Sequence, residues 1–177
     1  SLPPSFVLPQ RQMVDKAAAL KQTRLMFTPT LFWVDDAFRD RKSVNSQGRV
    51  THYCYARHMR DPDLPFDQTA TSTCTPADGA GADKFRAGMA ACFKRAVDKG
   101  LAIHVAPHLD DGLGLGGWRN GLVFDPLARY GALSYAEFML YPLADALNAA
   151  IGPDTRVSFA LQVRERRDRE GREEERG

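Results

Sequence analysis

The residues between positions 107 and 120 combine most of the side-chain types that bind a polar ligand. The segment begins Pro-His-Leu-Asp-Asp and, after a glycine-rich stretch, ends with an aromatic ring, a cation and an amide. Its polar and aromatic members include His108, Asp110, Asp111, Trp118, Arg119 and Asn120. Charged and amide groups bind neighbouring hydroxyl groups, and the apolar C–H face of a sugar ring stacks on an aromatic ring. This combination therefore predicts a sugar-binding site.

Three helices and three strands are predicted to position these residues. Helices are expected over residues 10–22, 83–99 and 134–151, and strands over 25–33, 101–107 and 156–162. The connections from helix to strand are short, whereas those from strand to helix, 34–81 and 108–133, are long. Alternating helices and strands predict parallel strands with right-handed crossovers. All the long loops then lie at the carboxyl ends of the strands, where α/β proteins place their sites.

The middle strand has two different faces. Leu101, Ile103 and Val105 alternate with Ala102 and His104, so the large aliphatic side chains point one way and the smaller ones the other. We expect helices to cover the aliphatic face and the second face to look into a barrel. His108 would then lie at the rim. Trp33, at the end of the preceding strand, would lie beside it on the same rim, so Trp33 and His108 are expected to share one cleft.

Local signals mark several element ends. Ser134 and Glu137 match a capping box, in which each side chain binds the other residue's backbone N–H. Gly100 stands where a helix should stop, and Pro142 should kink the third helix. A small hairpin is predicted over 44–55, around Asn-Ser-Gln-Gly. His104 is interpreted as a hydrogen-bonded core histidine rather than a ligand.

The glutamates are unevenly distributed. Of six in the chain, five lie in the last thirteen residues, within an Arg- and Glu-rich tail. The sixth is Glu137, which the capping box already explains. We therefore divide the chain into a globular domain over 1–162 and a low-complexity tail over 163–177.

Composition excludes several classes of protein. The chain has 177 residues, 44% of them hydrophobic, which suits one globular domain with a real core. A formal charge of +2, without a basic patch, gives no argument for a nucleic-acid partner. No apolar run is long enough for a membrane span. Cys54 and Cys74 bracket a loop that a disulfide would close in an oxidising compartment, and Cys92 is expected inside a helix. The compartment is weakly constrained, with the secretory pathway favoured.

A family resemblance rests on these motifs. The segments are Phe27-Thr28-Pro29 with Trp33, Thr75-Pro76, the run from Lys99 to Asp110, Trp118-Arg119, and Ser134 to Phe138. Together they resemble the family 113 glycoside hydrolases, β-mannanase-like (β/α)₈ barrels of a retaining clan. The resemblance implies that His108, Asp110, Trp118 and Arg119 line the substrate subsites after the third barrel strand, and Trp33 those after the second. It implies an oligo- or polysaccharide partner and no cofactor.

The catalytic carboxylates of that family have no clear counterpart. Its general acid follows the fourth strand and its nucleophile lies near the seventh, whereas the chain runs from residue 162 directly into the tail. Glu165 is the one weak candidate for the acid. We therefore expect a partial barrel of about three parallel strands, truncated and inactive alone. Its exposed sheet edges would favour association. The alternative is a non-catalytic carbohydrate-binding or degenerate protein.

A second resemblance leads to a different chemistry. The run from Pro107 to Asp111 is also similar to the Pro-His-Pro-Asp-Asp-Glu loop of zinc-dependent sugar N-deacetylases. There, His108 and Asp111 would hold zinc and Asp110 would act as the base. Gly112 replaces the acidic residue, and no histidine follows His108 to complete the metal site. This interpretation is therefore the weaker one, and no metal is expected.

Overall fold

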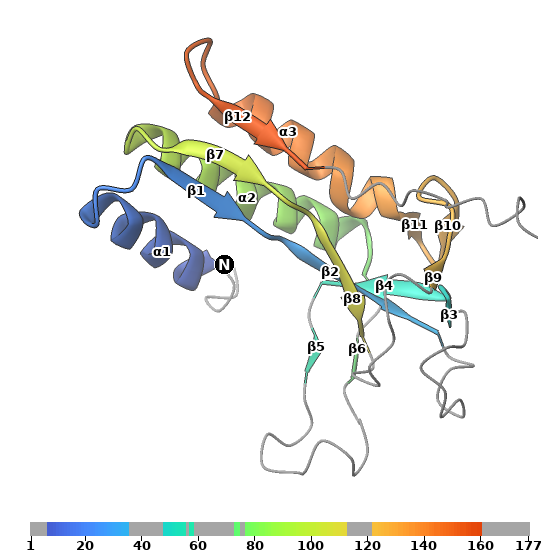
Figure 1. Cartoon of the computed structure of the whole chain (residues 1–177). Coiled ribbons are helices and arrows are strands. Elements are labelled where there is room, and N and C mark those ends of the chain that lie inside the picture. Colours follow the sequence, from blue (N-terminus) through green and yellow to red (C-terminus); the bar gives the residue numbers. More distant parts are fainter. Residues whose placement is uncertain are drawn as a thin grey trace, which may run out of the picture.

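The computed structural model describes residues 7–35, 48–55, 57–58, 73–74, 77–112 and 122–160. Its helices are α1 (Val7–Ala19), α2 (Gly79–Asp98), the π-helical turn η3 (Ala136–Leu140) and α3 (Tyr141–Ala150). Its strands are β1 (Arg24–Phe27), β2 (Thr30–Val34), β3 (Gly48–Arg49), β4 (His52–Cys54), β5 (Arg57–His58), β6 (Thr73–Cys74), β7 (Ala102–Val105), β8 (His108–Asp111), β9 (Leu122–Val123), β10 (Arg129–Tyr130), β11 (Leu133–Ser134) and β12 (Val157–Phe159). The chain is a mixed α/β structure built around parallel strands (Figure 1).

The central sheet has the order β1-β7-β12, and both pairings are parallel. The strands therefore lie side by side in the order in which they occur along the chain. The backbone N–H of Ala102 donates to Thr23 at 2.9 Å, and that of Ile103 donates to Arg156 at 2.9 Å. The prediction of three parallel strands is confirmed.

β2 continues β1, and β8 continues β7 (Figure 1). The pairing of β2 with β8 keeps the parallel register of β1 with β7. Between them stand Pro29 and Pro107, which occupy equivalent positions on the two neighbouring strands. Proline has no N–H, so each one omits a ladder hydrogen bond and divides its strand in two. The two strands keep the same pairing register across the prolines, because the N–H of His108 still donates to the Pro29 carbonyl at 2.8 Å. The central strand thus reaches Asp111, and its predicted end at Pro107 is wrong.

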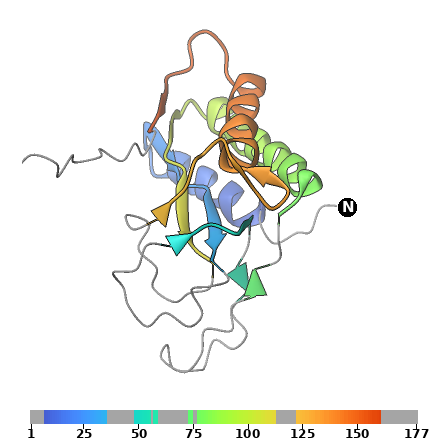
Figure 2. The same ribbon diagram turned by 90° about the vertical axis from the view of Figure 1, so that its right-hand side faces the viewer.

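The helices all cover one face of the central sheet. Figure 2 shows α2 and α3 on the same side of the strands, and α2 contacts both α1 and α3. We call this side of the sheet the core face. Its buried side chains include Phe27, Leu31, Trp33, Ile103, Val105 and Leu109. The opposite side, the outer face, carries the alternate residues, among them Met26, Thr30, Phe32, His104, His108, Asp110 and Ser158.

The ends of α2 follow from its sequence. The Asp78 carboxylate accepts from the Gly81 N–H at 2.7 Å and caps the helix, which therefore begins before the predicted position 83. At the other end Gly100 has φ 71, and its N–H donates to the Val97 carbonyl at 2.8 Å. A left-handed residue there is favourable for glycine, so the predicted stop is confirmed.

Short strands extend the sheet at the β2–β8 end. β4 pairs antiparallel with β2, whereas β3 pairs with β9. The predicted hairpin over 44–55 is therefore wrong, because its two described strands have different partners. Cys54 in β4 is disulfide-bonded, and Cys92 is a buried thiol in α2. The remaining cysteine of the chain is Cys74.

The predicted helix over 134–151 begins with a π-helical turn. Pro142 lies in the first turn of α3, and it provides no N–H for the Phe138 carbonyl four residues earlier. The wider π-helical turn η3 precedes this point, as expected where a proline disturbs the α-helical pattern. The Tyr55 hydroxyl donates to the Phe138 carbonyl at 2.6 Å and supplies the missing donor.

We predict that Tyr55→Phe lowers the free energy of unfolding by about 1–2 kcal/mol, because it leaves a buried carbonyl without this donor. The loss should shrink in a Pro142→Ala background, since the alanine amide can donate to Phe138. Tyr53→Phe is the matched control. Its hydroxyl is buried with no hydrogen-bond partner in the described part of the chain, so its removal should not destabilise. Urea denaturation measures all three, and equal losses for the two single variants would contradict the assignment.

Candidate carbohydrate-binding site

His108 and Asp110 lie on the outer face of β8, at the carboxyl end of the central parallel strand. Their side chains are 30% and 47% exposed, and Nδ1 of His108 lies 3.8 Å from Oδ1 of Asp110. This distance is too long for a hydrogen bond but allows attraction when the imidazole is protonated. An imidazole and a carboxylate therefore share one accessible face of the sheet.

Asp111 lies on the opposite face of the same strand. Consecutive strand residues point to opposite faces, and Asp111 is 9% exposed on the side that also buries Leu109. His108 and Asp111 therefore do not converge, as shared zinc coordination would require. Within the part of the chain that the structure describes, no three His, Cys, Asp or Glu side chains form a metal-binding group. The geometry argues against the deacetylase interpretation.

Trp33 also lies on the core face. It is 2% exposed and packs in the main core with Tyr53, its partner across the β2–β4 pair. A buried indole offers no free face for stacking, so in this structure Trp33 does not contribute to a cleft with His108. The sequence did not reveal this, because a tryptophan at a strand end suits either the core or a ligand.

The carboxylate that follows β2 has a structural role. Asp35 is buried and accepts a hydrogen bond from the Arg49 backbone N–H at 2.7 Å, which holds the chain leaving β2. Four predicted site residues, Trp118, Arg119, Asn120 and Glu165, lie outside the described residues.

A second polar pair on the outer face was not expected. Nδ1 of His104 lies 2.6 Å from Oγ of Ser158, its direct partner in the parallel β7–β12 pair. The predicted hydrogen-bonding role of His104 is confirmed, although the ring lies on the outer face instead of in the core. The sequence alone does not single out Ser158, because its position next to His104 becomes known only from the pairing of β7 with β12.

Glu137 is held in a structural role. Its carboxylate accepts from Arg129 at 3.1 and 2.5 Å and from the Ser134 backbone N–H at 2.8 Å, while its own N–H donates to the Ser134 hydroxyl at 3.2 Å. The capping box is thus confirmed. The Arg129 hydrogen bonds, followed by the Ser134 backbone, lower the pKa of Glu137 to about 2. A carboxylate so strongly ionised cannot donate a proton near neutral pH.

We predict that Glu137 makes stability depend on acid pH. Its pKa in the folded state is lowered to about 2 from its ordinary value of 4.5, so its contribution to stability is complete above pH 4.5 and disappears as the pH falls through about 2. The melting temperature of Glu137→Gln should therefore lie below that of the wild type at pH 7. This difference in melting temperature should become smaller as the pH falls from 4.5 to about 2. Thermal unfolding followed by circular dichroism measures it. A difference that stays constant down to pH 2 would refute the ion pair as its source.

Comparisons with protein-family models, with curated proteins and with solved structures find no match. The function is therefore argued from the residues and their geometry. Among the helices that the structure describes, none is long and apolar enough to cross a membrane.

Proposed function

We propose that the chain is a carbohydrate-active, glycoside hydrolase-like protein whose strands form part of a (β/α)₈ barrel. Two features of the sheet support this. The parallel strands follow one another in chain order, and α1, α2 and α3 cover the same face. A barrel has this arrangement, whereas a doubly wound sheet carries helices on both faces. The outer face would then line the barrel interior.

The observation that carries the proposal is the position of His108 and Asp110. Both lie on the outer face at the carboxyl end of the central parallel strand, which is where barrels bind their substrates. An exposed carboxylate accepts hydrogen bonds from hydroxyl groups, and an imidazole donates or accepts one. β-Mannan or a related β-glycan is the ligand that fits both this chemistry and the family resemblance.

Of the activities that such a protein could have, we favour carbohydrate binding without hydrolysis. Retaining cleavage needs two carboxyl groups about 5 Å apart. Outside the tail the sole glutamate is Glu137, and it is engaged with Arg129 and Ser134. Because Glu137 is engaged in this way, a non-catalytic carbohydrate-binding protein is the second candidate function. The disulfide at Cys54 supports an oxidising compartment, such as the secretory pathway.

Association through the sheet edges belongs to the same proposal. In the described part of the central sheet, β1 and β12 each have a single strand partner, β7. Parallel strands at an edge present N–H and C=O groups to a further strand. We therefore propose that these edges pair with additional strands of a barrel.

We predict that Asp110→Asn weakens binding to soluble β-mannan by roughly tenfold or more, because a charged hydrogen bond contributes about 1.5–3 kcal/mol. Affinity electrophoresis and calorimetry with mannohexaose measure the change. Asp145→Asn, an exposed carboxylate on α3, is the matched control and should bind like the wild type. Equal binding by Asp110→Asn and the wild type would remove Asp110 from the site.

We also predict that the chain as given releases no reducing sugar from β-mannan at neutral or mildly acidic pH, although it retains binding. A reducing-end assay on purified protein provides the measurement. Release that Glu165→Gln abolishes, with binding preserved, would show that Glu165 is catalytic and that our view of the tail is wrong.

A further inference from the structure

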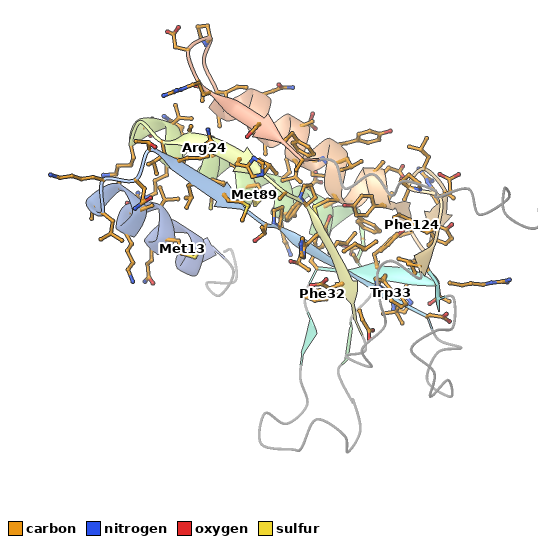
Figure 3. All side chains as sticks on the ribbon, in the orientation of Figure 1. Met13, Arg24, Phe32, Trp33, Met89 and Phe124 are labelled. Carbon is orange, nitrogen blue, oxygen red and sulfur yellow. The ribbon has the colours of Figure 1, made fainter. Side chains whose placement is uncertain are left out.

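We propose that the amino end of the central sheet binds a phosphate group on its outer face. β1, β7 and β12 are parallel, so all three begin at this end. Arg24 lies here, at the opposite end of the β1–β2 segment from Phe32 and Trp33 (Figure 3). The outer face is open to solvent, since Met26 is 56% exposed and the side chains of Arg24 and Ser158 are exposed as well. A ligand can therefore reach it.

Two arginines flank the central strand on this face. Arg24 is the direct partner of Ala102 in the β1–β7 pair. On the other side, the carbonyl of Arg156 accepts from the Ile103 N–H at 2.9 Å, and Val157 after it packs toward the core. Arg156 therefore points to the outer face, opposite Ala102. Two strand spacings place the two arginine backbones about 10 Å apart, with an alanine methyl between them. Both guanidinium groups can thus reach one anion over Ala102.

The charges of these two arginines are not neutralised by neighbouring carboxylates. Arg86, Arg95 and Arg129 each bind a carboxylate. Arg24 and Arg156, in contrast, form no ion pair with any residue that the structure describes. A guanidinium is always charged, and its planar fork of N–H groups binds two phosphate oxygens at once. Both groups are therefore available to an anionic ligand.

A further donor lies two residues along the same face. His104 and Ser158 are direct partners in β7 and β12, and Nδ1 of His104 lies 2.6 Å from Oγ of Ser158. When the hydroxyl donates to Nδ1, Nε2 of the neutral imidazole carries a proton that can be donated to a ligand. When Nδ1 donates instead, the hydroxyl proton is left for a ligand. Either arrangement offers one donor on the outer face.

The positions of these donors indicate the class of ligand. The two guanidinium groups and the histidine–serine pair approach from three sides, which suits the oxygens of a tetrahedral oxyanion better than those of a planar carboxylate. The connections that lead into the three strands add Lys21 and Lys99, and their acidic residue is Asp154. This end of the sheet is therefore basic overall and attracts anions.

The test is isothermal titration calorimetry with inorganic phosphate and with glucose 6-phosphate at fixed ionic strength. Acetate serves as the planar anion. The wild type is compared with Arg24→Gln, with Arg156→Gln and with Arg156→Lys, which keeps the charge but loses the fork. Lys99→Gln is the matched control, because it removes a positive charge at the same end of the sheet but from the end of α2, on the side that the helices cover. All these side chains are exposed, so thermal unfolding should show an unchanged fold.

Arg24→Gln and Arg156→Gln should each weaken phosphate binding by about tenfold or more, and Arg156→Lys should also bind more weakly than the wild type. Lys99→Gln should bind within about twofold of the wild type. Tighter binding of the ester would identify a phosphorylated small molecule as the ligand, and tighter binding of the ion would identify inorganic phosphate. Both results support the site.

Three results would overturn the site: no binding of either phosphate by the wild type, acetate binding as tight as phosphate binding, or an equal loss in Lys99→Gln. Asp110→Asn separates this site from the carbohydrate site. Asp110 lies six residues beyond His104, about 20 Å along the strand, so its substitution should leave phosphate binding unchanged. Each of the two sites can therefore fail its test while the other stands.

Discussion

The pairing between residues 24–33 and 102–111 determines what the rest of the chain can do. It keeps one alignment from β1–β7 into β2–β8, across two prolines that omit their N–H groups. Because side chains alternate in a strand, this single alignment decides which residues share a face. It joins Phe32, Asp110 and His108 on the outer face and sends Trp33 and Asp111 to the core face.

The same alignment explains why the carbohydrate site that we propose lies on the sheet and not in the loop after it. Had the central strand ended at Pro107, His108 to Asp111 would be loop residues that could turn toward one point. With the strand continuing to Asp111, Asp110 and Asp111 face opposite directions. Only one carboxylate of this adjacent pair reaches the outer face, which suits ligand binding better than chemistry that needs two.

The fold was predictable wherever a local signal decides the structure. The capping box at Ser134, the stop at Gly100 and the alternation over Leu101–Val105 each depend on nearby residues, and each is confirmed. The wrong expectations depend on contacts between distant segments. β3 pairs with β9 rather than with β4, and Trp33 is buried against Tyr53. Periodicity cannot anticipate either, because both arise from the partner strand and not from the segment itself.

The acidic side chains of the described region differ in the groups that they contact. Asp15 binds Arg95 in α2 through both carboxylate oxygens, at 2.8 and 2.6 Å, and Glu137 binds Arg129 in the same way. A guanidinium remains charged at any physiological pH, so these contacts persist and the carboxylates serve the fold. The Asp110 carboxylate lies 3.8 Å from the His108 imidazole, which is charged only when it is protonated. The contacts of Asp15 and Glu137 thus assign these carboxylates to the fold, whereas the binding role that we propose for Asp110 rests on its place at the carboxyl end of the central strand.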